Sequence, residues 1–239
     1  MVQIPSFPEC KHAVVANLAH QTDQALLTLF QRQPEAGQYF LAIFCRYSPI
    51  VYTLIQHSAR SPVQANYLFA LTWRHIYHEL RGLDLHEMEG KGEAAAHQTL
   101  DWSETGDSSS AQPATLQNWL INITAVCINS AQLPPTESIH YSLDQVSPPL
   151  WCYLEQSLSQ LAPLQRIVIL LSQTFHWSKV RISAYLKAEG EAISMEELDT
   201  ILQSSYHLLK ERLPEDIQSV YLPDLEAMIP PSSEEEAMA

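Results

Sequence analysis

Positive charge is scarce in this sequence, and no Lys or Arg occurs between Gly92 and Gln165. The 239 residues include 13 Lys and Arg against 27 Asp and Glu, so the formal net charge is −14. Proteins that grip duplex DNA gain most of their affinity by neutralising phosphates with Lys and Arg. The charge therefore argues against a large nucleic-acid footprint, and leaves only binding through a small basic patch or through a partner.

The patterns of common catalytic and metal sites are missing as well. With only six Gly, the chain has neither a Gly-rich phosphate loop nor a G-x-S-x-G nucleophile elbow. His75 and His78 lie three residues apart and His86 follows, but no H-E-x-x-H pattern completes a zinc site. We therefore expect no enzyme activity, no metal and no cofactor, and interpret these histidines as surface or satisfied core residues.

Cysteine is also infrequent. Cys10, Cys45, Cys127 and Cys152 show no C-x-x-C spacing, and three of them lie in apolar helical patterns. This favours buried, reduced thiols and a reducing compartment. The sequence has no basic segment followed by an apolar one at its start, and no run of eighteen apolar residues. It therefore predicts a cytoplasmic protein with no membrane partner.

Most of the chain carries apolar residues at helical spacing, with abundant Leu, Ala, Gln and Glu. This pattern predicts an all-α protein with two helical domains joined by a Pro-rich linker. The first domain is expected at residues 13–133, where a long acidic loop at 81–114 precedes the last helix. The helices of this domain are expected at residues 13–33, 38–56, 62–80 and 115–131, with caps at Thr22 and Asp23, a first-turn Pro62, and a cap or kink at Pro49.

Two pairs of prolines mark the expected linker, residues 134–149. The second domain is expected at residues 150–222, and it contains the pattern of a helix-turn-helix, with Trp177 and Ser178 at the turn and cap. Residues 223–239 are interpreted as an acidic tail.

Three strings of residues follow one another in a familiar order. The first is R-Y-x-P-x-V-Y from Arg46 to Tyr52, the second is W-L-x-x-I from Trp119 to Ile123, and the third is the helix-turn-helix string that ends in H-W-S-K-V-R-I-S-A-Y-L at Leu186. Together they resemble the sigma-70 family of transcription initiation factors, in its two-domain, extracytoplasmic-function type. The resemblance implies a partner, the RNA polymerase core, and promoter DNA as a second partner, against which the acidic charge argues.

The resemblance also implies where contacts would lie. The third helix would dock on polymerase, although the acidic pair and the glutamine usual at this place are absent; the candidate residues are Asn66, Tyr67, Ala70, Trp73, Arg74 and Tyr77. The helix after the acidic loop would hold melted single-stranded DNA, and its candidates are Trp119, Asn122 and Asn129. Its exposed face is expected to be neutral, which makes strand melting improbable on charge grounds.

Candidates for duplex DNA or for a protein partner come from the second domain. They are Lys179, Arg181, Lys187, His207 and Lys210. The expected recognition helix begins with Glu196, Glu197 and Asp199, which repel phosphates, so Ser194 and Glu197 are better explained as a capping box. Two functions therefore stay open: a sigma-like transcription factor or regulator bound to polymerase, and a protein-interaction adaptor that has lost DNA binding.

Overall fold

The computed structural model describes residues 5–84 and 115–228, with the backbone alone for residues 223–228. All its regular elements are helices, and no strand occurs among the described residues. The expected all-α class is therefore confirmed. Most of the acidic loop expected at 81–114 lies outside the described residues, as does the tail from residue 229 onward.

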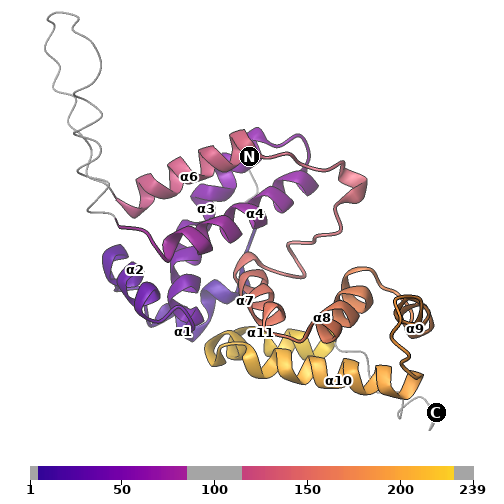
Figure 1. Cartoon of the computed structure of the whole chain (residues 1–239). Helices are drawn as coiled ribbons and strands as arrows, with labels where there is room; N and C mark the ends of the chain where they lie inside the picture. Colours follow the sequence, from indigo (N-terminus) through magenta and orange to yellow (C-terminus); the bar gives the residue numbers. More distant parts are fainter. Residues whose placement is uncertain (1–4, 85–114, 229–239) are drawn as a thin grey trace, which may run out of the picture.

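The first half of the chain forms a bundle around one long central helix, α3 (Figure 1). Its elements are η1 (Pro8–Lys11), α1 (Ala13–Ala16), α2 (Asp23–Arg32), α3 (Gly37–Ser58), α4 (Pro62–Leu80) and α6 (Leu116–Ser130). Helices α2, α4 and α6 all pack on α3. The contacts are rich in buried aromatic rings; Phe44, for example, lies 4.9 Å from Trp73 between ring centroids. The edge-to-face arrangement of these rings suits their quadrupoles and fills the core.

Side-chain caps explain why these helices begin where they do. Thr22, Ser61 and Thr115 each accept a hydrogen bond from a backbone amide in the first turn of α2, α4 and α6. The predicted cap at Thr22 is thus confirmed. The predicted interruption at Pro49 is not a helix end, because α3 continues through it to Ser58.

The second half supplies two more helices to this same core. They are α7 (Pro148–Ser159) and α11 (Glu215–Met228), and the short η2 (Thr136–Ser138) precedes α7. Helix α7 packs on α4 and α3, while α11 packs on α3 and α7. Their buried residues, including Tyr153, Ile217 and Tyr221, belong to one hydrophobic cluster with Phe7, Phe40 and Trp73.

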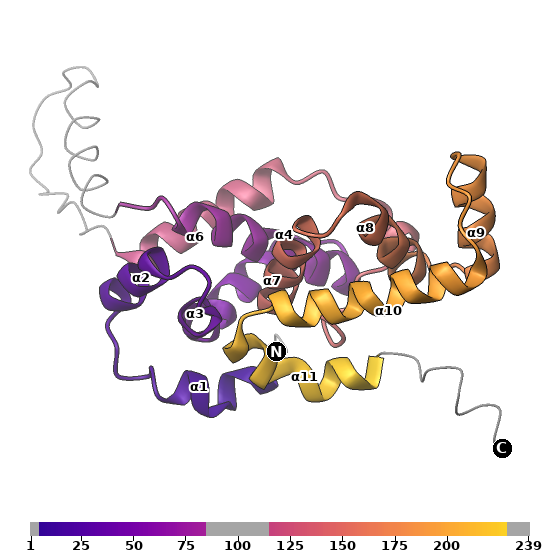
Figure 2. The same ribbon diagram turned by 60° about the horizontal axis from the view of Figure 1, so that its bottom comes forward.

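Smaller clusters gather the remaining helices. Helix α8 (Pro163–Ile169) runs into the π-helical turn η3 (Leu170–Thr174), and α9 (Lys179–Ala188) and α10 (Met195–Arg212) follow. Val168, Ile182 and Leu198 join these elements around a separate cluster. Figure 2 shows α9 at the far end of α10, away from the first bundle. Ser178 caps α9, as expected, and Ser194 and Glu197 form the expected capping box of α10.

The hydrophobic clusters group the helices differently from the expected domain boundaries. The expected linker, 134–149, contributes Leu143 to the first cluster, and α7 and α11 pack there too, although both start within or after the linker. Residues 223–228, expected in the acidic tail, continue α11. The hydrophobic pattern along the sequence cannot reveal this, because an apolar helix face does not specify which core it joins.

The cysteine prediction is wrong for one pair. Cys10 of η1 and Cys45 of α3 form a disulfide, with their Cα atoms 5.3 Å apart. They lie 35 positions apart in sequence, and no spacing motif marks them. Packing brings them together, because the ring of Phe7 lies against Phe44 and so places η1 beside α3. Cys127 and Cys152 are free thiols, and Cys152 is buried, as predicted.

Within the described ranges, none of the helices combines the length and the apolar character needed to cross a bilayer.

Candidate functional site: the α4 face and the helix that covers it

The six residues expected to dock on polymerase lie along α4, and three of them are buried. We call Asn66, Tyr67, Ala70, Trp73, Arg74 and Tyr77 the α4 face. Ala70 and Trp73 are fully buried, and Tyr77 is 1% exposed. Asn66 accepts a hydrogen bond from the hydroxyl of Tyr52, at 2.9 Å. In this conformation half of the α4 face is therefore buried, and Asn66, Tyr67 and Arg74 stay partly exposed.

Helix α7 contacts Tyr67, Arg74 and Tyr77 of the α4 face, whereas Asn66 and Trp73 contact α3. Arg74 forms an ion pair with Glu155, with 2.6 Å between Nη2 and Oε1. One residue further on, Gln156 accepts a hydrogen bond from the hydroxyl of Tyr77, at 2.7 Å. At the other end, the ring of Tyr67 stacks on Trp151 with 6.4 Å between centroids. We call Trp151, Glu155 and Gln156 the α7 cover.

Arg81 strengthens the bond between Tyr77 and the cover. Its Nη2 donates to the hydroxyl of Tyr77 at 2.8 Å and to Oε1 of Gln156 at 3.2 Å. Burial raises the pKa of Tyr77, and the nearby Arg81 opposes that rise. The phenol therefore stays protonated at neutral pH and donates its proton to Gln156. This donor chain links α4 to α7 across 79 positions of sequence.

The segment before α7 extends the cover. The ring of Tyr141 lies 5.0 Å from that of Trp151 and 6.2 Å from that of Tyr67. Further along α4, the side-chain amide of Gln64 donates to the carbonyl of Pro134 at 3.2 Å. The expected linker thus runs along α4 rather than away from it.

The polar residues of the R-Y-x-P-x-V-Y string have structural partners. The guanidinium of Arg46 and the hydroxyl of Tyr47 both bond to the carboxylate of Asp23 at the start of α2. Arg46 also donates to the carbonyl of Gln21, at 2.9 Å. These contacts fix α2 against α3, so this part of the family resemblance reflects packing.

The three single-strand candidates lie on α6 but differ in exposure. Trp119 is 8% exposed and packs in the first cluster, so its ring is not free to stack on a base. Asn122 and Asn129 are exposed. No charged residue occurs in α6. The expected neutral face is present, and it offers no counter-charge for phosphates.

The candidates for a duplex or a partner lie on α9 and α10. Lys179 is paired with Asp199 at 2.7 Å, and the guanidinium of Arg181 lies 4.0 Å from the ring centroid of Trp177. Lys187 and Lys210 are exposed. His207 lies 3.4 Å from Glu211 on the same helix. The first turn of α10 is acidic, and that end would repel a phosphate backbone.

An exposed aromatic corner near α9 was not predicted as a site. Phe175 is 61% exposed and Val180 is 70% exposed, and the ring of Trp177 lies between Phe175 and Tyr185. His176 at the turn has a positive φ of 50°. The sequence signal was available, since no acidic residue occurs from Pro163 to Ala188.

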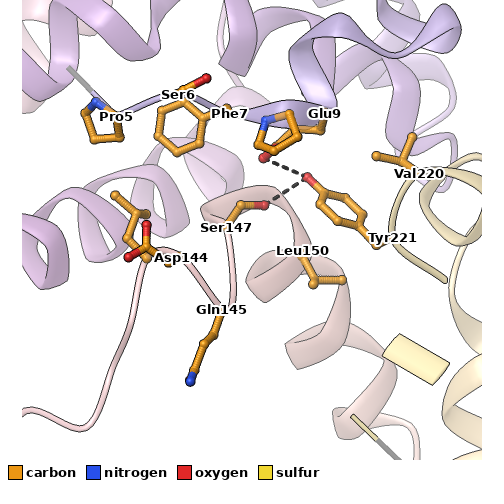
Figure 3. Close-up of a pocket in the computed structure, with 12 residues that line it drawn as sticks. Pro5, Ser6, Phe7, Glu9, Asp144, Gln145, Ser147, Leu150, Val220 and Tyr221 are labelled. Atoms are coloured by element: carbon orange, nitrogen blue, oxygen red, sulfur yellow. Dashed lines mark hydrogen bonds between the residues drawn. The ribbon is translucent and has the colours of Figure 1, made fainter. Parts of the chain in front are cut away.

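A second unpredicted feature joins the two ends of the described chain. A pocket of about 200 Å³ lies between η1, the segment before α7, and α11 (Figure 3). At its wall the hydroxyl of Tyr221 donates to Glu9 at 3.1 Å and lies 2.9 Å from the hydroxyl of Ser147. Burial raises the pKa of Tyr221 far above its ordinary value, and the carboxylate of Glu9 adds to this rise. We call Glu9, Ser147 and Tyr221 the terminal latch.

The described residues hold no group of three or more His, Cys, Asp or Glu placed to bind a metal ion. Their polar clusters connect helices to one another, as the α7 cover and the terminal latch do. No protein-family model matches the chain, and neither a curated protein nor a solved structure shows significant similarity to it.

Proposed function

We propose that this protein is a sigma-like regulator that binds RNA polymerase core through the α4 face, and that α7 must leave this face before binding. The observation that carries the proposal is the α7 cover. It contacts three of the six residues that the family resemblance assigns to polymerase, namely Tyr67, Arg74 and Tyr77. An internal helix in this place would compete directly with the partner.

The order of the helices supports the same proposal. A bundle built on α3 and α4, with a long insertion before α6, is followed by the α8 to α10 group with its capped turn at Ser178. This is the order that the resemblance implies for a two-domain sigma factor. Fold alone does not assign an activity, so the α4 face has to be tested directly.

The character of the cover suits a reversible contact. The Arg74–Glu155 pair is partly solvated, with 41% and 38% of the two side chains exposed. Exposed ion pairs contribute little to stability, typically about 0.2 to 1 kcal/mol. These polar contacts can be exchanged for contacts to a partner at small cost, whereas the buried Leu150, Cys152 and Tyr153 set the main cost of moving α7.

The test is co-purification of the tagged protein with core RNA polymerase, followed by abortive initiation on the complex. The informative variant is Glu155→Arg, which places a second cation beside Arg74 and repels α7 from α4. We expect it to bind polymerase more tightly than the wild type. The control is Ser159→Arg, which also introduces an arginine into α7, but at an exposed position near its end.

If Glu155→Arg does not change binding while the wild type binds, the cover does not compete with polymerase. If neither protein binds polymerase, the proposed function is wrong. Transcripts from the complex would indicate an initiation factor, and binding without transcripts would indicate a regulator.

A second candidate function, a protein-interaction adaptor, is favoured by the aromatic corner near α9. This corner combines exposed Phe175 and Val180 with Arg181 in a segment that has four basic and no acidic residues. A protein surface with carboxylates around apolar groups would complement it. In the same co-purification, loss of a non-polymerase partner on Phe175→Ser would support the adaptor.

A further inference from the structure

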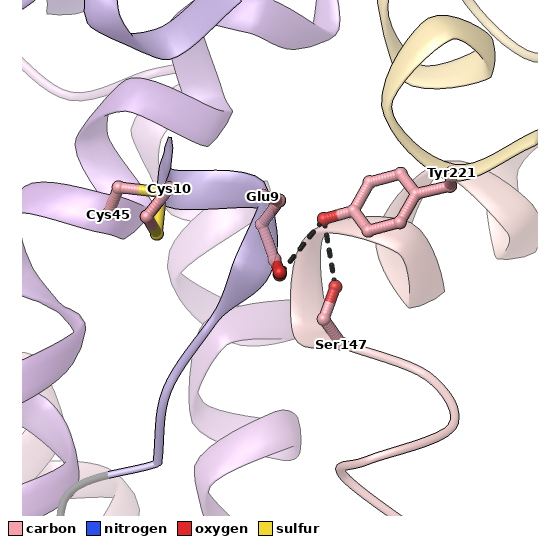
Figure 4. Close-up of a disulfide and its surroundings, with 5 residues drawn as sticks. All are labelled: Glu9, Cys10, Cys45, Ser147 and Tyr221. Carbon is pink, nitrogen blue, oxygen red and sulfur yellow. Dashed lines mark hydrogen bonds between the residues drawn. A yellow bond between two sulfur atoms is a disulfide. The ribbon is translucent and has the colours of Figure 1, made fainter. Parts of the chain in front are cut away.

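The disulfide lies directly beside the terminal latch. Glu9 and Cys10 are neighbours in η1, so the bond that ties Cys10 to α3 also fixes the backbone that carries Glu9 (Figure 4). Glu9 is 5% exposed and meets Tyr221 of α11. Tyr221 in turn meets Ser147, the residue that immediately precedes α7. One covalent bond therefore positions the residue that holds α11 and the start of α7.

Helix α11 also contacts the first bundle at a second place, the start of α3. The side chain of Ile217 is fully buried against Gly37, and the carboxylate of Asp216 accepts a hydrogen bond from the amide of Gln38 at 2.6 Å. Helix α11 contacts both α3 and α7. Loosening α11 at Tyr221 therefore removes support from α7, the helix that covers α4.

We propose that Cys10–Cys45 is a redox-active disulfide, and that its reduction by a dithiol loosens the terminal latch and uncovers the α4 face. The role of the uncovered α4 face in polymerase binding rests on the proposed function. The movement of α11 and α7 on reduction does not depend on it. The reactant is a dithiol of the kind that reduces protein disulfides.

The reaction balances without another cofactor. A thiolate of the dithiol attacks one sulfur of the Cys10–Cys45 bond and forms a mixed disulfide, and the second thiol of the reductant then displaces the remaining sulfur. Cys10 and Cys45 gain two electrons and two protons as thiols. The dithiol loses them and becomes a disulfide.

The Cys10–Cys45 disulfide is exposed enough to react with a dithiol. Cys10 and Cys45 are both half-buried, so a small dithiol can reach the bond. The free thiols are poor competitors, because burial raises the pKa of Cys152 and also that of Cys127. A protonated thiol is a weak nucleophile, so neither cysteine exchanges readily with the disulfide.

Phe7, the residue just before η1, makes contacts that do not depend on the disulfide. The ring of Phe7 lies 4.9 Å from Phe44 and 5.8 Å from Phe69, and reduction leaves these contacts in place. The bundle of α2, α3, α4 and α6 is therefore expected to stay folded. The change should be confined to η1, α11 and α7.

The experiment is hydrogen exchange of the full chain with dithiothreitol and without it. Before reduction, two of the four cysteines should titrate as free thiols in denaturant, because Cys127 and Cys152 are unpaired. On reduction we expect amides of α11 and of the start of α7 to exchange about tenfold faster or more, while those of α3 keep their protection.

Two variants sharpen the result. The double variant C10S/C45S should exchange like the reduced protein in both conditions, and Cys127→Ala should respond to dithiothreitol like the wild type. Equal exchange of α11 in the oxidised and reduced wild type would overturn the inference, and so would four titrating thiols in the untreated protein. Neither result requires a variant to fold.

Polymerase binding separates the two proposals. Faster exchange of α11 with polymerase binding only after reduction supports both. Faster exchange of α11 with no polymerase binding in either state supports the redox-active disulfide and contradicts the proposed function. Unchanged exchange of α11 with equal polymerase binding in both states contradicts the redox-active disulfide and supports the proposed function.

Discussion

The carboxylate of Asp216 caps α3 from the opposite end of the chain, since its Oδ2 accepts the backbone amide of Gln38, 178 positions earlier. The residue at the N-cap itself, Ala36, has no side chain able to do this. The first amides of a helix need acceptors, and an anion there also favours the helix dipole. The first turn of the central helix is therefore completed by α11.

Asp216→Ala should lower the free energy of unfolding by about 1 kcal/mol, the typical cost of losing an N-cap. Urea denaturation followed by circular dichroism measures this change. Glu215→Ala is the matched control, because Glu215 is an exposed acidic neighbour on the same turn. Equal effects of the two substitutions would mean that Asp216 contributes only its charge.

Gly37→Ala should loosen α11 by overpacking. A Cβ at Gly37 would lie 2.2 Å from Cγ1 of Ile217, whose side chain is fully buried. Overpacking of this kind costs about 1 to 3 kcal/mol of unfolding free energy. Gly82→Ala is the matched control, since an added Cβ there meets no atom within 4 Å.

The pair G37A/I217A tests this contact directly. Removing the branched side chain of Ile217 makes room for the new methyl group, so the double variant should be more stable than the sum of the two single effects predicts. Additive effects would show that Gly37 and Ile217 do not interact.

Tyr221→Phe should destabilise the protein by about 1 to 3 kcal/mol, because it leaves the buried Glu9 without its donor. Thermal or urea unfolding measures the loss. Tyr39→Phe removes a hydroxyl from a half-buried tyrosine of α3 and should change stability by less than about 0.5 kcal/mol. A neutral Tyr221→Phe would show that water replaces the hydroxyl and that the terminal latch contributes little.

The capping box of α10 predicts a pH dependence. Hydrogen bonds from the backbone amide and the hydroxyl of Ser194 lower the pKa of Glu197. A lowered pKa in the folded state means that the stabilisation is complete above the ordinary glutamate range. It is lost as the pH falls through the lowered value.

NMR titration of the Glu197 carboxyl should therefore show a higher midpoint in Ser194→Ala than in the wild type. A Glu197 midpoint that is unchanged in this variant would rule out the capping contact as its cause.

The order and type of the helices could be predicted from sequence because they depend on local signals. Apolar spacing, Thr22, Ser178 and the Ser194–Glu197 box all act within a few residues, and the structure has each of them. The neutral α6 and the acidic start of α10 could be predicted in the same way. The charge of a helix face or of its first turn depends only on the residues of that helix.

The α7 cover, the disulfide and the terminal latch could not be predicted in this way. Tyr77 and Gln156 are 79 positions apart, and Glu9 and Tyr221 are 212 apart. None of these four residues stands out in its own segment, because a polar residue on a helix predicts only exposure to solvent. Their meaning depends on which helix packs opposite, and the helical pattern along the sequence does not contain that information.

The shared core of the two chain ends also has a consequence for synthesis. Phe7 and Phe30 belong to the same hydrophobic cluster as Leu213, Ile217 and Tyr221. A ribosome releases the chain from its N-terminus, and helices with neighbouring partners can form early. The first bundle cannot bury its core fully until α11 has emerged, so nascent chains that stop before residue 213 should expose apolar surface and depend on chaperones.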